Sequence, residues 1–191
     1  MPDSKSPLVK TWLEITREER YFCAELFFEI RKDIKKFIQF LNQYTKLNLD
    51  LDQEWEIGYE VCFYRDYLFD KGIGVKSSTY HDKRTFDLCL FSNTHIIVIE
   101  AKVDQSFYPK QLESLKNDVE NDIYSVLKLN KDDITIQGAL LFSTCRKPTI
   151  AHNFAEFDWD QLSKYYKENK YFPIANEVPR KPKPKRIKAQ A

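Results

Sequence analysis

The stretch KRTFDLCLFSNTHIIVIEAK, residues 83–102, decides the fold of this chain. Residues 84–91 and 95–101 are rich in β-branched, aromatic and aliphatic side chains, which favours two strands. The Ser-Asn-Thr sequence between them supplies a turn, because Asn tolerates the left-handed backbone of a tight hairpin. The stretch therefore predicts an antiparallel β-hairpin.

The register of this hairpin brings two carboxylates together. With the Asn-Thr pair as a two-residue turn, Asp87 lies opposite Glu100, with Cβ atoms roughly 5 Å apart on one face of the sheet. Lys102 follows Glu100 by two residues and projects from the same face. A turn longer by one residue would make the contact between the two acids diagonal without removing it.

Two carboxylates at this separation favour a partner of opposite charge. They repel each other by ~1 kcal/mol in water and by ~3 kcal/mol at an effective dielectric constant near 20. A divalent cation between them would turn the repulsion into attraction, and hard oxygen ligands suit Mg²⁺. The alternative is an ion pair at the end of the sheet, in which Lys102 neutralises Glu100 or Asp87.

These residues resemble the active-site signature of the PD-(D/E)XK, or restriction-endonuclease-like, nuclease superfamily. An Asp is followed after a 12-residue spacer by Glu-Ala-Lys behind a hydrophobic strand, and Phe86 stands where the motif has Pro. The resemblance implies that Asp87 and Glu100 hold Mg²⁺, for which Mn²⁺ can substitute, together with the carbonyl oxygen of Ala101. It also implies that Lys102 assists the attacking water.

The resembled nucleases sometimes draw a further acid from the first strand or the first helix. Residues 54–68 predict a long strand that carries Glu60, which would join the metal ligands or pair with Arg65 or Lys102. Residues 17–43 predict a helix that begins with a capping box at Thr16. Glu25 borders the apolar stripe of this helix, where a solvated position on the helix flank is the alternative to a role in the site.

A helix predicted over residues 106–127 follows the Glu-Ala-Lys motif closely. Gln111 lies on its buried edge, from which it would orient the nucleophile or a water molecule on the metal. Some of the resembled nucleases carry a Gln here that is followed four residues later by Tyr, whereas this chain has Leu115 at that position.

The remaining pattern completes the predicted fold. Residues 134–143 predict a nearly continuous apolar strand, and Asp158 is the expected cap of a helix over residues 159–169. The predicted order is helix, strand, strand, strand, helix, strand, helix. It agrees with the α-β-β-β-α-β core of the resembled nucleases and predicts an α/β fold with a mixed central sheet flanked by helices.

Length and composition predict one globular domain. Of the 191 residues 42% are hydrophobic, and the four cysteines lack the spacing of a zinc site, which favours reduced core thiols and a cytoplasmic protein. We expect an N-terminal arm over residues 1–15, a nuclease-like domain over 16–175 and a basic tail rich in Pro and Lys over 176–191. No apolar run has the length of a signal peptide core or a membrane span, so no membrane partner is expected.

The charge distribution limits how nucleic acid can bind. The chain has 30 basic and 29 acidic residues, but six of the basic residues follow Pro179. The rest of the chain has 24 basic and 29 acidic residues and is therefore net acidic. Bulk attraction therefore does not hold nucleic acid, and binding needs a local basic patch, the tail and the bound metal. The loop over residues 70–82 has Lys71, Lys76, Lys83 and Arg84 in or beside it, and its Lys, Ser, Tyr and His side chains together suit phosphate contacts. Such a composition is also ordinary for a solvated loop.

These features predict a Mg²⁺-dependent nuclease that hydrolyses phosphodiester bonds, with DNA as the expected substrate. The resemblance implies products with 5′-phosphate and 3′-hydroxyl ends, and an enzyme that cuts double strands would pair as a homodimer. One alternative is a noncatalytic nucleic-acid- or protein-binding module on the same fold, in which the acids and Lys102 form a buried ion network. Another is a subunit that binds a protein partner through its tail, residues 176–191.

Overall fold

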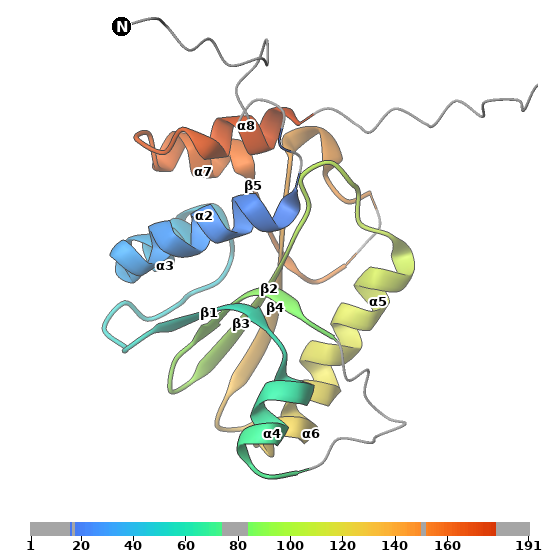
Figure 1. Cartoon of the computed structure of the whole chain (residues 1–191). Coiled ribbons are helices and arrows are strands. Elements are labelled where there is room, and N and C mark those ends of the chain that lie inside the picture. Colours follow the sequence, from blue (N-terminus) through green and yellow to red (C-terminus); the bar gives the residue numbers. More distant parts are fainter. Residues whose placement is uncertain (1–15, 17, 74–83, 150–151, 179–191) are drawn as a thin grey trace, which may run out of the picture.

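The computed structural model of this chain describes residues 16, 18–73, 84–149 and 152–178. Within them, five strands form one mixed sheet in the order β1-β2-β3-β4-β5 (Figure 1). The strands are β1 (Glu56–Val61), β2 (Phe86–Phe91), β3 (His95–Ala101), β4 (Thr135–Phe142) and β5 (Ala155–Asp158). Pairing is antiparallel from β1 to β3, whereas β4 is parallel to both β3 and β5. The predicted α/β class with a mixed central sheet is confirmed.

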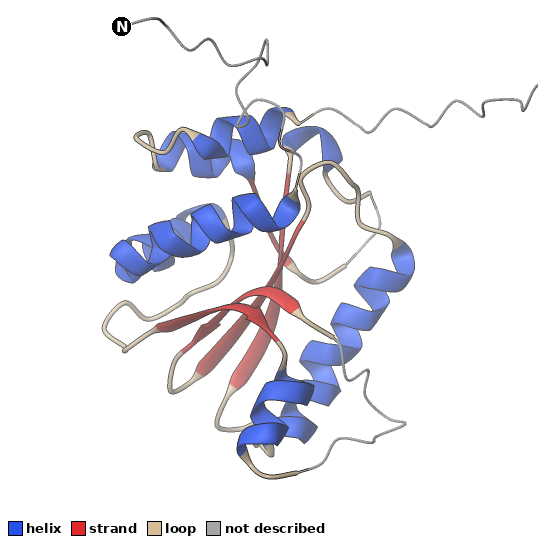
Figure 2. Cartoon of the chain, in the orientation of Figure 1, coloured by secondary structure: helices blue, strands red, loops and turns tan. Residues whose placement is uncertain are grey.

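Helices cover both faces of this sheet (Figure 2). One face packs against α2 (Glu19–Lys32), α3 (Ile34–Tyr44), α7 (Trp159–Tyr165) and α8 (Tyr171–Glu177). The other face packs against α4 (Leu68–Asp70), α5 (Pro109–Asn117), α6 (Ile123–Leu127) and the π-helical turns Phe63–Tyr67 and Asp118–Asp122. A 3₁₀ turn, Thr144–Arg146, follows β4. None of the helices in the described ranges is both long enough and apolar enough to cross a membrane.

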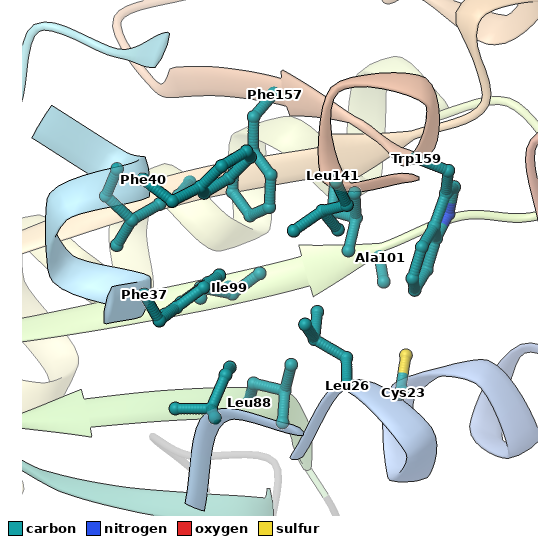
Figure 3. Packing of buried hydrophobic residues seen from close by; sticks show 14 of the residues in the cluster. Cys23, Leu26, Phe37, Phe40, Leu88, Ile99, Ala101, Leu141, Phe157 and Trp159 are labelled. Atoms are coloured by element: carbon teal, nitrogen blue, oxygen red, sulfur yellow. The ribbon is translucent and has the colours of Figure 1, made fainter. Parts of the chain in front are cut away.

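Alternate residues of the central strands face two hydrophobic clusters. Ile99 and Leu141 project towards α2, α3 and α7, where they meet aromatic rings that include Phe40 (Figure 3). Val98 and Leu140 project to the opposite side, towards α5 and α6. Because both faces of these strands are covered, charged side chains at their ends lie beside an apolar interior.

The predicted central hairpin and its register are confirmed. The backbone amide of Ser92 donates to the carbonyl oxygen of His95 over 2.9 Å, which closes a two-residue turn. The backbone pairs that follow have the expected register and end with Leu88 opposite Ile99. One residue further along each strand, the hairpin reaches the two carboxylates of the predicted site.

The strand predicted over residues 54–68 is wrong beyond Val61, where the chain leaves the sheet. Phe63 and Tyr64 instead begin a π-helical turn, and both are buried in the cluster beside α5 and α6. In a strand these neighbours would point to opposite faces, whereas a helical turn lets both rings enter one cluster. Within β1 the backbone of Gly58 leaves no room for a side chain, because a Cβ there would lie 2.5 Å from Cγ2 of Val61.

The single helix predicted over residues 17–43 is also wrong. Asp33 interrupts it with φ −155° and ψ 89°, and its carboxylate accepts a hydrogen bond from the backbone amide of Lys36 over 3.0 Å. Asp is a preferred N-cap because this bond satisfies an amide that the first helical turn leaves without a partner. The capping box predicted at Thr16 is absent, since the N-cap of α2 is Glu18, which makes no side-chain capping bond.

The second half of the chain follows the predicted order and adds two elements. Asp158 and Gln161 form a complete capping box, which confirms the predicted cap, although α7 ends at Tyr165. The helix predicted over residues 106–127 begins at Pro109 and contains a π-helical turn. The pattern does not predict β5 and α8, because such short segments show little periodicity.

Some predicted features lie outside the described residues. These are the arm over residues 1–15, most of the loop over residues 70–82, and the tail beyond residue 178. All four cysteines are free thiols, as expected, but Cys145 is exposed, so the prediction of a core position is wrong for it.

Candidate functional site at the end of the central hairpin

The candidate site lies where β2 and β3 separate. Asp87 on β2 turns its carboxylate towards β3, and Oδ2 accepts a hydrogen bond from the backbone amide of Ala101 over 2.8 Å. The side chain thus replaces a backbone acceptor where the antiparallel ladder ends. On the other side of β3, the amide of Lys102 donates to the carbonyl oxygen of Leu141 over 2.8 Å. The end of β3 is therefore held by hydrogen bonds on both sides.

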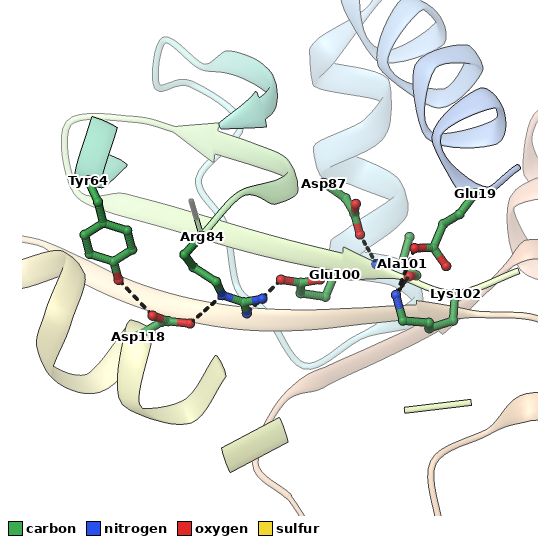
Figure 4. Close-up of polar contacts among 8 residues, drawn as sticks. All are labelled: Glu19, Tyr64, Arg84, Asp87, Glu100, Ala101, Lys102 and Asp118. Carbon is green, nitrogen blue, oxygen red and sulfur yellow. Dashed lines mark hydrogen bonds and ion pairs between the residues drawn. The ribbon is translucent and has the colours of Figure 1, made fainter. Parts of the chain in front are cut away.

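Glu100 on β3 belongs to a chain of polar contacts (Figure 4). Its Oε1 lies 2.9 Å from Nη2 of Arg84, whose Nε donates to Oδ2 of Asp118 over 3.0 Å. The other oxygen of Asp118 accepts a hydrogen bond from the hydroxyl of Tyr64 over 2.8 Å. Glu100 and Asp118 are only 4% and 5% exposed, so water does not screen these charges.

Lys102, which directly follows β3, contacts helix α2. Its Nζ donates to Oε1 of Glu19 and to the carbonyl oxygen of Ala101, both over 2.8 Å. It also lies 5.7 Å from the centre of the Phe107 ring, and 12% of the side chain is exposed. The ammonium group is therefore fixed by Glu19 and the Ala101 carbonyl, and the charges of Asp87 and Glu100 also act on it.

We call the following residues the hairpin-end cluster: Glu19, Arg84, Asp87, Glu100, Lys102 and Asp118. Its four carboxylates and two cations carry a formal charge of −2 when all are ionised. Burial and the negative charge of Asp87 raise the pKa of Glu100 to about 8, although neighbouring cations oppose the shift. Burial likewise raises the pKa of Asp87, against the hydrogen bond from Ala101. At neutral pH the cluster therefore retains a proton unless a cation takes its place.

The pKa of Lys102 decides what this residue can do. Burial alone would lower it, but the charge of Glu19 and the hydrogen bond between the two side chains outweigh burial, so the pKa is raised. Lys102 therefore stays protonated at neutral pH. It can stabilise negative charge or donate a proton, whereas a general base would need a lowered pKa.

The oxygen atoms of this site suit a divalent cation in kind, although their carboxylates face different partners in this structure. In the part of the chain that the structure describes, no three His, Cys, Asp or Glu side chains converge in an arrangement that could hold a metal ion. Yet Oε1 of Glu100 and Nη2 of Arg84 are buried without a hydrogen bond, although they lie 2.9 Å apart. An unsatisfied buried oxygen and an excess of negative charge both favour a hard cation. Asp87, Glu100 and the carbonyl oxygen of Ala101 are the groups that would hold it.

Three other predicted residues lie outside the hairpin-end cluster. Glu60, which has a positive φ of 52°, pairs with Nε of Arg20 over 3.2 Å. Glu25 lies partly exposed on α2 near Tyr21. Gln111 is half-buried in the first turn of α5, and its side chain makes no hydrogen bond with the residues that are described. None of the three touches the two carboxylates in this structure.

A groove of about 570 Å³ runs beside α5 and β4. Its lining includes Leu112, Glu113, Gln137 and Phe154, and none of the hairpin-end cluster. Pro109 and Leu112, which flank Gln111 in the sequence, both line the groove.

The structure adds residues that the sequence pattern does not assign to this site: Glu19, Tyr64 and Asp118. For Glu19 a signal exists, because it precedes Cys23 by four residues and Leu26 by seven and so continues the buried stripe of α2. Tyr64 and Asp118 have no such signal. They meet across 54 positions of sequence, and local periodicity carries no information about that contact.

Replacing Glu19 by Gln should lower the pKa of Lys102, because the charge that holds it above its ordinary value is removed. The chain should also lose about 1–2 kcal/mol of unfolding free energy, since a largely buried ammonium group loses its partner. Titration of the lysine side chains by NMR and urea unfolding measure these effects. Glu25→Gln, on the same helix, is the matched control and should change neither. An unchanged Lys102 pKa in Glu19→Gln would contradict the assigned contact.

The fold and the cluster define an α/β protein with a lysine and buried carboxylates gathered at the end of its central hairpin. Neither a family model nor a curated protein nor a solved structure matches the chain. The geometry and charge of the site itself are therefore the guide to its function.

Proposed function

We propose that this chain is a metal-dependent phosphodiesterase of the PD-(D/E)XK type that hydrolyses nucleic acid, with DNA as the expected substrate. The observation that carries the proposal is that Asp87, Glu100 and Lys102 lie at one end of the central hairpin, where their charges act on one another. Burying carboxylates with an excess of negative charge opposes folding. Such an arrangement at the end of apolar strands favours a functional role over a structural one.

The order of elements supports the same class. The sequence α2, β1, β2, β3, α5, β4 agrees with the α-β-β-β-α-β core that the resemblance implies. The two acids lie on the second and third strands, which are neighbours in the sheet. Motif and topology thus favour one interpretation, which is stronger support than either alone.

The chemistry follows from the groups present. Mg²⁺ held by Asp87, Glu100 and the carbonyl oxygen of Ala101 would supply Lewis-acid stabilisation of the phosphate charge and would make water more acidic. Lys102 would stabilise the negative charge that develops on the phosphate oxygens as water attacks phosphorus and the bond to the 3′ oxygen breaks. Its raised pKa favours charge stabilisation over deprotonation of the water. Glu19 would hold Lys102 in that protonated state.

A noncatalytic binding module is the second candidate, and one observation favours it. Each charged side chain of the hairpin-end cluster has a partner within the chain. A closed ion network can tie together the end of a sheet without metal or substrate. The two candidates differ in metal uptake, because such a network has no site-specific affinity for Mn²⁺.

Incubation of the purified chain with linear, circular and single-stranded DNA, and with RNA, tests the proposal. We expect cleavage of DNA in Mg²⁺ or Mn²⁺, none in EDTA, and products with 5′-phosphate and 3′-hydroxyl ends. Titration with Mn²⁺ in the absence of nucleic acid should show saturable uptake. If neither uptake nor cleavage occurs, the nuclease is rejected and the closed ion network is the better account.

A further inference from the structure

An acidic protein body requires local cations wherever a phosphate is to bind. In the hairpin-end cluster these cations are Lys102 and Arg84. Lys102 belongs to the proposed catalytic motif, whereas Arg84 has no role in it. Arg84 lies two residues before β2, and only 20% of its side chain is exposed. A mostly buried arginine between Glu100 and Asp118 therefore needs an explanation of its own.

One side of the Arg84 guanidinium group is firmly held. Its Nε donates to Asp118 over 3.0 Å, and Tyr64 holds the other oxygen of that carboxylate over 2.8 Å. The ring of Phe86 lies 4.8 Å from the guanidinium carbon. These contacts come from three segments of the chain, so they fix the position of the group independently of Glu100.

The contact on the other side is an ion pair without a hydrogen bond. Nη2 of Arg84 lies 2.9 Å from Oε1 of Glu100, but the pair lacks the alignment of a hydrogen bond. Figure 4 shows Asp118 and Glu100 on opposite sides of the guanidinium group. Arg84 can therefore exchange Glu100 for another anion while Asp118 keeps it in place. A cation at Glu100 would compete with Nη2 for the same oxygen.

We propose that Arg84 is a substrate-binding residue that changes partners when the site is loaded. When a divalent cation binds Glu100, the guanidinium group keeps Asp118 and turns its Nη2 donors to a nonbridging oxygen of the phosphodiester. Arginine suits this task because its planar fork binds one anion while donating to a second. Asp118 and Tyr64 are then positioning residues. The inference rests on the proposed function, since it requires the cation.

Two binding measurements test this exchange in a Lys102→Met background, chosen to suppress cleavage. The first is a titration with Mn²⁺, and the second is the anisotropy of a labelled DNA oligonucleotide in Mn²⁺. Adding Arg84→Met should tighten Mn²⁺ binding about five- to tenfold, because the internal competitor is gone. It should weaken oligonucleotide binding about tenfold, because a charge-assisted contact to phosphate is lost. Arg65→Met, which removes an exposed arginine paired with Asp66, is the control and should change neither.

If Arg84 binds substrate, Arg84→Met raises the affinity for Mn²⁺ and lowers the affinity for the oligonucleotide. If Arg84 has only a structural role, both affinities fall. If Arg84→Met does not fold, Arg84→Lys tests the same inference, because lysine keeps the positive charge but lacks the planar guanidinium group that binds two anions at once. Oligonucleotide affinity should then fall about fivefold while Mn²⁺ affinity changes less than about twofold. Unchanged oligonucleotide affinity, or weaker Mn²⁺ binding by Arg84→Met, would overturn the inference and leave the nuclease proposal intact. Absence of Mn²⁺ uptake by the Lys102→Met protein and by the wild type would instead reject the metal site. The nuclease proposal and the role of Arg84 would then both be rejected.

Discussion

Replacing Lys102 by Met should slow DNA cleavage by about 10²- to 10³-fold, the loss typical of removing one charge-stabilising donor from an active site. Met preserves an apolar stem of similar length, so the packing beside Phe107 remains. Mn²⁺ uptake should persist, because Lys102 is not among the proposed ligands and its positive charge opposes a second cation. Initial rates in saturating Mg²⁺ and a Mn²⁺ titration measure the two quantities on the same protein.

Lys164→Met supplies the matched control for this experiment. Lys164 is an exposed lysine on α7 that pairs with Asp160, remote in sequence from the hairpin. Its replacement should leave the cleavage rate within about twofold of wild type, as expected for a surface ion pair. A folded Lys102→Met protein that takes up Mn²⁺ and cleaves DNA at nearly the wild-type rate would contradict the role assigned to Lys102.

Replacing Glu100 by Gln should abolish cleavage and, in EDTA near pH 8, stabilise the folded chain by about 1–3 kcal/mol. Burial and the charge of Asp87 raise the pKa of Glu100 from 4.5 to about 8. Between these pH values the folded state binds a proton that the unfolded state has lost, so the free energy of unfolding falls as pH rises. The stabilisation from the protonated carboxyl is complete below pH 4.5 and is lost as the pH passes about 8. Gln cannot ionise and escapes this loss.

Urea unfolding of both proteins in EDTA, near pH 5 and near pH 8, measures this difference. Wild type should gain stability on addition of Mg²⁺ at the higher pH, by mass action, whereas Glu100→Gln should not. Glu168→Gln, at an exposed position, is the control and should behave as wild type in both respects. If wild type and Glu100→Gln differ in unfolding free energy by the same amount at both pH values, Glu100 has the same pKa in the folded chain as in the unfolded one, and the assigned pKa shift is contradicted.

The parts of the fold that sequence predicts correctly are those determined by near neighbours. A two-residue turn sets the pairing of every residue in the hairpin, so Leu88 opposite Ile99 follows from the turn alone. The capping box at Asp158 is likewise local. Sequence prediction fails where tertiary packing or side-chain capping competes with local preference. The apolar stripe of residues 17–43 continues past Asp33, yet the helix ends there. Phe63 lies beyond the end of β1 in a π-helical turn, in which its ring is buried.

The candidate site divides in the same way. Sequence alone determined that Asp87, Glu100 and Lys102 lie at the end of one hairpin, because side-chain alternation and a tight turn act within 20 residues of chain. Only the tertiary structure decided which charges surround them. The contact between Glu19 and Lys102 spans 83 positions, and Arg84 reaches Asp118 across 34. Burial among these partners raises the pKa of both acids and keeps the lysine protonated, because desolvation and neighbouring charge exist only once the chain has folded.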